Sequence, residues 1–143
     1  MSGLQHQWQT LGKAWQMNPA MFVQQALGAT PEIWQQEALQ SLCTDDRIAV
    51  RSGHGVGKSA FSAWAILWWM YTKSPAKVAV TAPTSHQLQD ILWSELATWH
   101  RKMPKELQEL FELTATRFYL KAQPDTSFSV PRVSRPEKPE AFQ

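Results

Sequence analysis

The segment at positions 51–60, RSGHGVGKSA, constrains the fold more than any other part of this sequence. Gly53, Gly55 and Gly57 lie in it, and the whole chain of 143 residues holds six glycines. Because glycine loses more backbone entropy on folding than other residues, this cluster predicts backbone that turns sharply or lets a ligand come close. The apolar run Ile48 to Val50 before it predicts a short buried strand. The run KSAFSAWAILWWMYTK after it is apolar on nearly every face and predicts a buried helix.

A glycine-rich loop between a strand and a helix is the setting of the P-loop signature G-x-x-x-x-G-K-[ST]. Gly57, Lys58 and Ser59 fill its last three places, whereas Ser52 stands where the first glycine is expected. In such loops backbone N–H groups and a helix N-terminus converge on phosphate oxygens. The sequence therefore predicts an ATP site formed by Ser52, Gly53, His54, Gly55, Val56, Gly57, Lys58, Ser59 and Ala60.

Each residue type in this loop suits a chemical task. Lys58 is expected to place its charge on the β- and γ-phosphates, and the Ser59 hydroxyl to ligate the Mg²⁺ that bridges them. The alternative is a plain turn with Lys58 on a solvated helix start, but a cation is mildly unfavourable at the positive end of a helix dipole. His54 has no orienting partner in the sequence, so we interpret it as a solvent-facing loop residue rather than a general base.

Residues 1–44 are predicted to form a helical N-terminal segment. Apolar residues from Trp8 to Trp15 recur at spacings of three and four, which indicates an amphipathic helix. The stretch from Asn18 to Gly28 offers an N-cap asparagine, a proline at the first helical position and a terminating glycine. TPEIWQQEALQSL repeats this opening, with Thr30 as the expected N-cap and Pro31 after it.

Residues 45–143 are predicted to form a partial P-loop ATPase core. AKVAVTAPT indicates a second buried strand, and SHQLQDILWSELATWH a helix with Thr84 or Ser85 as its cap. Strand, helix, strand and helix in succession predict a parallel sheet with right-handed crossovers. TATRFYLKAQPDTSFSVPRVS holds two further β-rich pieces separated by the turn signal QPDT, which predicts a hairpin or a further pair of strands. The expected fold is thus α/β, a P-loop NTPase-like parallel sheet flanked by helices, and an incomplete domain.

Four segments, taken in order, resemble one family. WQQEAL, RIAVRSGHGVGKSA, VAVTAPTSHQLQDILWSEL and SRPEKPEAFQ are similar to the amino-terminal part of the ATPase domain of bacteriophage terminase large subunits. The resemblance covers roughly residues 18 to 143. It implies a motor that uses ATP and Mg²⁺ to drive DNA into a capsid, with double-stranded DNA, a terminase small subunit and a portal protein as partners. It also implies homo-oligomers in the full-length motor.

The resemblance suggests roles that the loop motif alone does not assign. A glutamine upstream of the P-loop reads adenine in such ATPases, and Gln35 is the best match, with Gln36 as second choice. The alternative for both is a polar helix face. The segment 81–84, TAPT, resembles one that contacts DNA or relays the nucleotide state, and the alternative is a strand end followed by a helix cap.

The catalytic residues are not assignable from the sequence. A P-loop ATPase of this kind needs a strand ending in acidic residues that complete the metal site and polarise the attacking water. No apolar run after Val80 ends in Asp-Glu, and we expect Asp45, Asp46, Asp90 and Glu95 to be badly placed for these tasks. The chain by itself is therefore expected to bind ATP but to hydrolyse it poorly.

Charge and hydropathy limit the cellular compartment that we expect for this chain. The sequence leaves two other functions open. The formal net charge of +2 does not by itself indicate nucleic-acid or membrane binding. The amino terminus lacks the pattern of a signal peptide and the longest apolar run is too short to span a bilayer, so we expect a protein of the bacterial cytoplasm. A non-catalytic nucleotide-binding or interaction module, such as a prophage remnant, is one alternative. A helicase-like or kinase-like P-loop enzyme of another family is the other.

Overall fold

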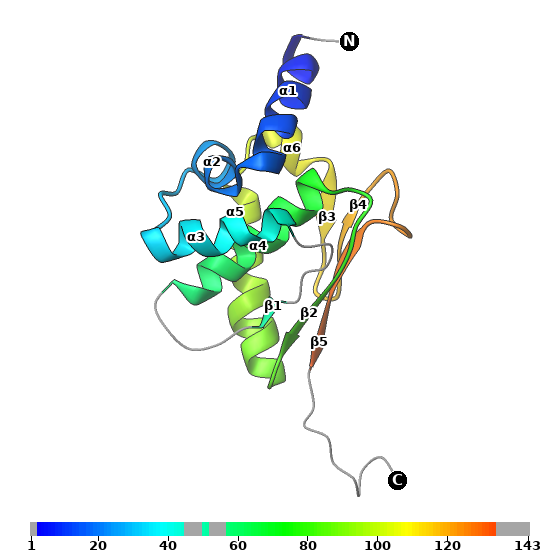
Figure 1. Ribbon diagram of the computed structural model, residues 1–143. Coiled ribbons are helices and arrows are strands. Elements are labelled where there is room, and N and C mark those ends of the chain that lie inside the picture. Colours follow the sequence, from blue (N-terminus) through cyan, green and yellow to red (C-terminus); the bar gives the residue numbers. More distant parts are fainter. Residues whose placement is uncertain (1–2, 45–49, 52–56, 134–143) are drawn as a thin grey trace, which may run out of the picture.

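The computed structural model describes residues 3–44, 50–51 and 57–133 of the chain (Figure 1). Its helical elements are α1 (Gly3–Met17), α2 (Pro19–Phe22), η1 (Val23–Leu27), α3 (Ile33–Ser41), η2 (Leu42–Thr44), α4 (Lys58–Thr72), η3 (His86–Trp93), α5 (Ser94–Arg101) and α6 (Lys105–Gln108). Its strands are β1 (Val50–Arg51), β2 (Lys77–Ala82), β3 (Phe111–Leu113), β4 (Phe118–Leu120) and β5 (Phe128–Val133). The predicted strand at Ile48 and Ala49 and the segment SRPEKPEAFQ lie outside the described residues.

Capping residues define where the N-terminal helices begin and end. The Asn18 side chain accepts a hydrogen bond from the backbone N–H of Met21 at 3.1 Å, and Gly28 ends η1 in the left-handed conformation, with φ of 72°. Both predicted boundaries are confirmed. The predicted start of the next helix at Thr30 and Pro31 is wrong by two residues: Glu32 is the N-cap of α3, because the Gln35 side chain closes back onto its backbone N–H at 2.8 Å.

Helix α4 is the centre of the fold, as its sequence predicts. Ten of its fifteen residues are buried, so it contacts other elements on nearly every face. The indole N–H of Trp68 donates to the backbone oxygen of Trp15 at 2.6 Å and joins α4 to α1. The N-terminal helices therefore pack against the same core as the sheet does.

The five-stranded sheet has the order β1-β2-β5-β4-β3 and is mixed. β1 and β2 are parallel, as predicted, and β5 is parallel to β2, but β4 runs antiparallel to both of its neighbours, β5 and β3. The prediction of a parallel sheet is therefore correct for only part of it. Short turns join β3 to β4 and β4 to β5, and a short turn leaves room only for antiparallel pairing. The β4–β5 hairpin around QPDT was predicted, whereas β3 and α6 were not.

The helices lie on one side of the sheet in Figure 1. Val78, Val80 and Phe118 are buried on that side against the helical layer. The burial of β2 alternates along the strand, so the odd-numbered residues from Lys77 to Thr81 point to the other side. The described core is thus a two-layer arrangement of helices on a mixed sheet.

Candidate phosphate-binding site at the start of helix α4

Parallel strands bring the candidate site together. β1 and β2 pair in parallel with Val50 opposite Val80 and Arg51 opposite Thr81, so their carboxyl ends meet at one edge of the sheet. Ligands of open α/β sheets bind at this edge. Of the predicted site, Gly57, Lys58, Ser59, Ala60 and Gln35 are described, and Ser52, Gly53, His54, Gly55 and Val56 lie outside the described residues.

Gly57 is the N-cap of α4 and requires glycine. Its φ is 81°, in the left-handed region, and a Cβ atom added to it would lie 2.8 Å from Nε2 of Gln35 and 3.4 Å from Cζ2 of Trp34. Any larger residue would therefore strain the backbone and collide with Gln35. The sequence predicted that the glycine cluster allows a close approach, and at Gly57 the closest group is a side chain of the same protein.

The first turn of α4 presents the two predicted phosphate-site residues. Lys58 is exposed and Ser59 half-buried, directly after Gly57. Gly57 has no side chain that could cap the first backbone N–H groups of the helix, which point out of the helix start. An uncapped helix start with a lysine and a serine offers N–H donors, a cation and a hydroxyl to an anion.

The side-chain amide of Gln35 is engaged at both ends. Nε2 donates to the backbone oxygen of Gly57 at 3.0 Å, and Oε1 accepts from the backbone N–H of Glu32 at 2.8 Å. Gln35 is only 3% exposed. The second choice for adenine reading, Gln36, donates through Nε2 to the backbone oxygen of Pro31 at 3.1 Å. The described structure therefore places Gln35 against Gly57, the last glycine of the cluster, with both ends of its amide already bonded.

The contact of Gln35 with Gly57 is the feature of this site that sequence reasoning missed. The spacing Glu32-x-x-Gln35 is that of a capping box with glutamate in the first place, and it is the local signal for the bond of the glutamine oxygen, although the sequence prediction put the N-cap at Thr30. No local signal indicated the partner of its Nε2, because Gly57 is 22 positions away.

The Trp34 ring lies beside Gly57 and pairs with the ring of Phe61. Trp34 is 40% exposed, although most tryptophans of the described chain pack in or against the core, and its ring centroid lies 5.8 Å from that of Phe61. Ile33 beside it is 76% exposed. The start of α3 thus forms an apolar rim next to the start of α4.

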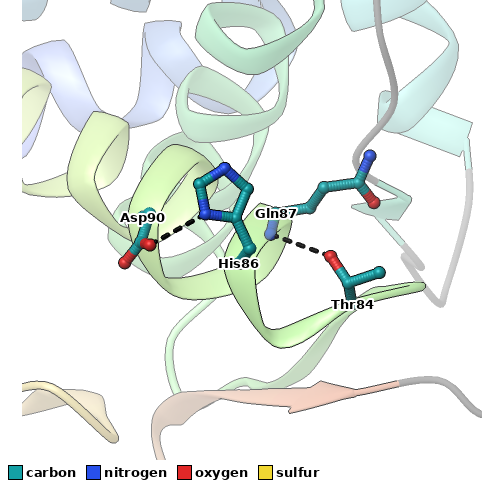
Figure 2. Close-up of polar contacts among 4 residues, drawn as sticks. All are labelled: Thr84, His86, Gln87 and Asp90. Carbon is teal, nitrogen blue, oxygen red and sulfur yellow. Dashed lines mark hydrogen bonds and ion pairs between the residues drawn. The ribbon is translucent and has the colours of Figure 1, made fainter.

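The TAPT segment leads from β2 into η3 on the same edge of the sheet (Figure 2). The Thr84 hydroxyl oxygen accepts from the backbone N–H of Gln87 at 3.1 Å, so of the two predicted capping residues Thr84 makes the contact. His86 Nδ1 lies 2.9 Å from Asp90 Oδ2, one helical turn on. The side chain of Gln87 points away from this pair in Figure 2.

The acidic residues considered for catalysis are engaged elsewhere or not described. Asp90 contacts His86, and Glu95 accepts from the indole N–H of Trp99 at 3.1 Å. Asp45 and Asp46 lie outside the described residues. Within the described part of the chain, no group of three or more His, Cys, Asp or Glu side chains could hold a metal ion. Ser59 as a Mg²⁺ ligand stays a prediction.

The titratable residues with shifted pKa values lie at the other end of α4. Burial lowers the pKa of His100 to about 4 and raises that of Tyr71. The Tyr71 hydroxyl donates to the backbone oxygen of Leu107 at 2.6 Å and lies 3.2 Å from Nε2 of His100. A hollow of about 500 Å³ opens at the same end, lined by Gln9, Thr10, Gly12, Lys13, Gln16, Tyr71 and Thr72. These groups pack α4 against its neighbours and are separate from the candidate phosphate site.

The fold and site define an α/β protein with a mixed sheet and a glycine-capped helix at the carboxyl edge of its parallel strands. A scan of protein-family models and searches of curated proteins and of solved structures found no match to this chain. In the described part of the chain, no helix has the length and apolar character needed to cross a membrane.

Proposed function

We propose that this chain binds ATP with Mg²⁺ through its glycine-rich loop and the start of α4, as the nucleotide-binding part of an ATPase similar to phage terminase large subunits. The observation that carries the proposal is the placement of Lys58 and Ser59. They follow a left-handed Gly57 in the first turn of a helix that begins at the carboxyl edge of parallel strands β1 and β2.

The chemistry of phosphate binding suits this placement. Backbone N–H groups at a helix start carry partial positive charge, and Lys58 adds a full charge that can reach the terminal phosphates. The Ser59 hydroxyl provides an oxygen ligand for Mg²⁺, which prefers oxygen ligands and keeps several waters. ATP hydrolysis and translocation of double-stranded DNA, with a small subunit and a portal protein as partners, belong to the proposal through the sequence resemblance.

The proposal is tested by titration calorimetry with MgATP and MgADP. We expect Lys58→Ala to abolish binding, because it removes the cation at the helix start. Lys105→Ala is the matched control, since Lys105 is an exposed lysine at the start of α6. Equal nucleotide affinity in the wild type and Lys58→Ala would contradict the proposal.

A non-catalytic nucleotide-binding module is a second candidate. The observation in its favour is that β5, the other parallel neighbour of β2, carries no Asp or Glu among its described residues Phe128–Val133. Both candidates share the nucleotide site and differ in turnover. A phosphate-release assay with a DNA cofactor, performed on the intact chain, separates them.

A further inference from the structure

The side of the sheet opposite the helices is accessible and carries an excess of positive charge. We call this surface the open face; it consists of Lys77, Ala79 and Thr81 on β2, Phe128, Val130 and Arg132 on β5, Tyr119 on β4 with Arg117 just before it, and Glu112 on β3. All of these side chains are exposed or half-buried, and the described helices lie on the other side (Figure 1). Parallel strands such as β2 and β5 usually have both faces packed, so this face is a candidate contact surface.

The charge of the open face is unbalanced. Its cations are Lys77, Arg117 and Arg132, and its carboxylate is Glu112. Among the described residues, none of these four side chains forms an ion pair. Glu112 lies on β3, two strands away from β5, so the positive charge is concentrated over β2 and β5.

Two of the cations share one aromatic ring. The Phe128 ring centroid lies 5.7 Å from Nζ of Lys77 and 4.6 Å from Cζ of Arg117, so the two charged groups are within about 10 Å of each other. The Arg117 guanidinium also lies over the Tyr119 ring and donates to the backbone oxygen of Pro124. That bond uses one of its five N–H donors. Arg117 is thus held in place while most of its donors stay available to an anion.

The third cation lies farther along the same strand. Arg132 follows Phe128 by four positions on β5, which is about 13 Å in an extended chain. Ala79 and Val130 are paired in register between these two positions, and both are small or apolar. The surface over β2 and β5 therefore has a cationic site at each end and an apolar centre.

We propose that the open face binds an extended acidic segment of another protein, which lies along β5. In an extended segment the residues i and i+4 point to the same side about 13 Å apart, so two carboxylates at these positions match the two cationic ends. A small apolar residue at i+2 would lie on Ala79 and Val130. Carboxylates suit the Arg117 end in particular, because a guanidinium can bind both carboxylate oxygens.

A nucleic-acid strand suits this face less well than an acidic peptide does. Bases bind single-strand sites largely by stacking on exposed aromatic rings, and the Arg117 guanidinium already lies over the rings of Phe128 and Tyr119. The apolar centre also interrupts the cations, whereas a phosphate backbone is charged along its whole length. A second copy of the chain would bring like charges together.

A titration followed by ¹H–¹⁵N NMR of the intact chain tests the proposal. The probe is the peptide acetyl-SESVSES-amide, which has carboxylates at i and i+4 and valine between them. We expect saturable shifts of the β2 and β5 amides with a dissociation constant on the order of 1 mM, weakened by added salt. The spacing control is acetyl-SSEEVSS-amide, which has the same composition and charge but adjacent carboxylates, and it should bind more weakly.

Charge reversal at each end of the face makes the test specific. Lys77→Glu and Arg132→Glu should each weaken binding of the probe at least about fivefold, because an attraction becomes a repulsion. Both side chains are exposed, so we expect the fold to be retained, which the dispersion of the NMR spectrum shows. Lys105→Glu is the matched control, since Lys105 is an exposed lysine on α6, and it should bind as the wild type does.

Three results would overturn the inference. The first is the absence of saturable shifts on β2 and β5 at about 5 mM peptide. The second is binding that both charge reversals leave unchanged. The third is tighter binding of an octamer of oligo(dT) to the same strands, which would assign the face to nucleic acid. The titration contains no nucleotide, so its outcome is independent of the proposed function.

Discussion

Gln35 and Gly57 are joined by a hydrogen bond from side-chain Nε2 to backbone oxygen, at 3.0 Å and across 22 positions of the sequence. The contact connects the start of α3 to the residue that begins α4. Because the oxygen of Gly57 also accepts the helical bond from the N–H of Phe61 at 3.0 Å, the glutamine holds the first turn of α4 in place. Gln35, which the sequence resemblance suggests as an adenine reader, is therefore bonded as a support of the start of α4.

We predict that Gln35→Ala weakens binding of ATP and GTP by similar factors. The lost hydrogen bond is worth about 1 kcal/mol, or about fivefold in affinity, and it acts on the loop rather than on the base. Calorimetric titration with both nucleotides measures this, with Gln40→Ala, an exposed glutamine of the same helix, as the control. If only ATP binding weakens, Gln35 reads adenine, and the bond to Gly57 is exchanged for one to the base.

Gly57→Ala should destabilise the fold more than Gly28→Ala. Both glycines have positive φ, 81° and 72°, so both substitutions should cost about 1 kcal/mol for the left-handed backbone. A Cβ at Gly28 meets no atom within 4 Å, whereas one at Gly57 would lie 2.8 Å from Gln35 Nε2. We expect about 1–3 kcal/mol more at Gly57 from this overlap. Urea unfolding of the two variants compares them, and equal losses would show that Gln35 moves aside freely.

Acidification should destabilise the chain through His100. Its pKa is about 4 in the folded state against 6.5 for the free side chain, because burial disfavours the charged ring. Between these values the unfolded chain binds more protons, so the stability present above pH 6.5 is lost as the pH falls toward 4. The loss from pH 7 to pH 5 should be about 2 kcal/mol.

Urea unfolding at several pH values tests this titration. His100→Phe should flatten the dependence between pH 5 and 7, whatever its effect on stability at neutral pH. An unchanged slope in His100→Phe would place the responsible group elsewhere.

The chain alone should hydrolyse ATP slowly or not at all. Phosphoryl transfer to water needs a carboxylate for the metal and a group that orients the water. The described candidates, Asp90 and Glu95, contact His86 and Trp99 instead. Phosphate release by the purified chain measures turnover, with Lys58→Ala as the contamination control. Rapid Lys58-dependent release would show that another carboxylate, from this chain or a second copy, completes the site.

The sequence by itself determined the elements that depend on neighbouring residues. Asn18 and Gly28 fixed the limits of a helix, the unbroken apolar run of α4 indicated a buried helix, and QPDT indicated a hairpin. Caps, periodicity and turns act over a few residues, so they can be predicted from a single chain.

Only the tertiary structure decided the contacts between distant parts. The bond of Gln35 to Gly57 and the antiparallel strands beside β5 both depend on how helices and strands pack together. Local signals in the sequence do not encode these pairings, because each partner is a separate element whose position is set by burial of the shared core around α4.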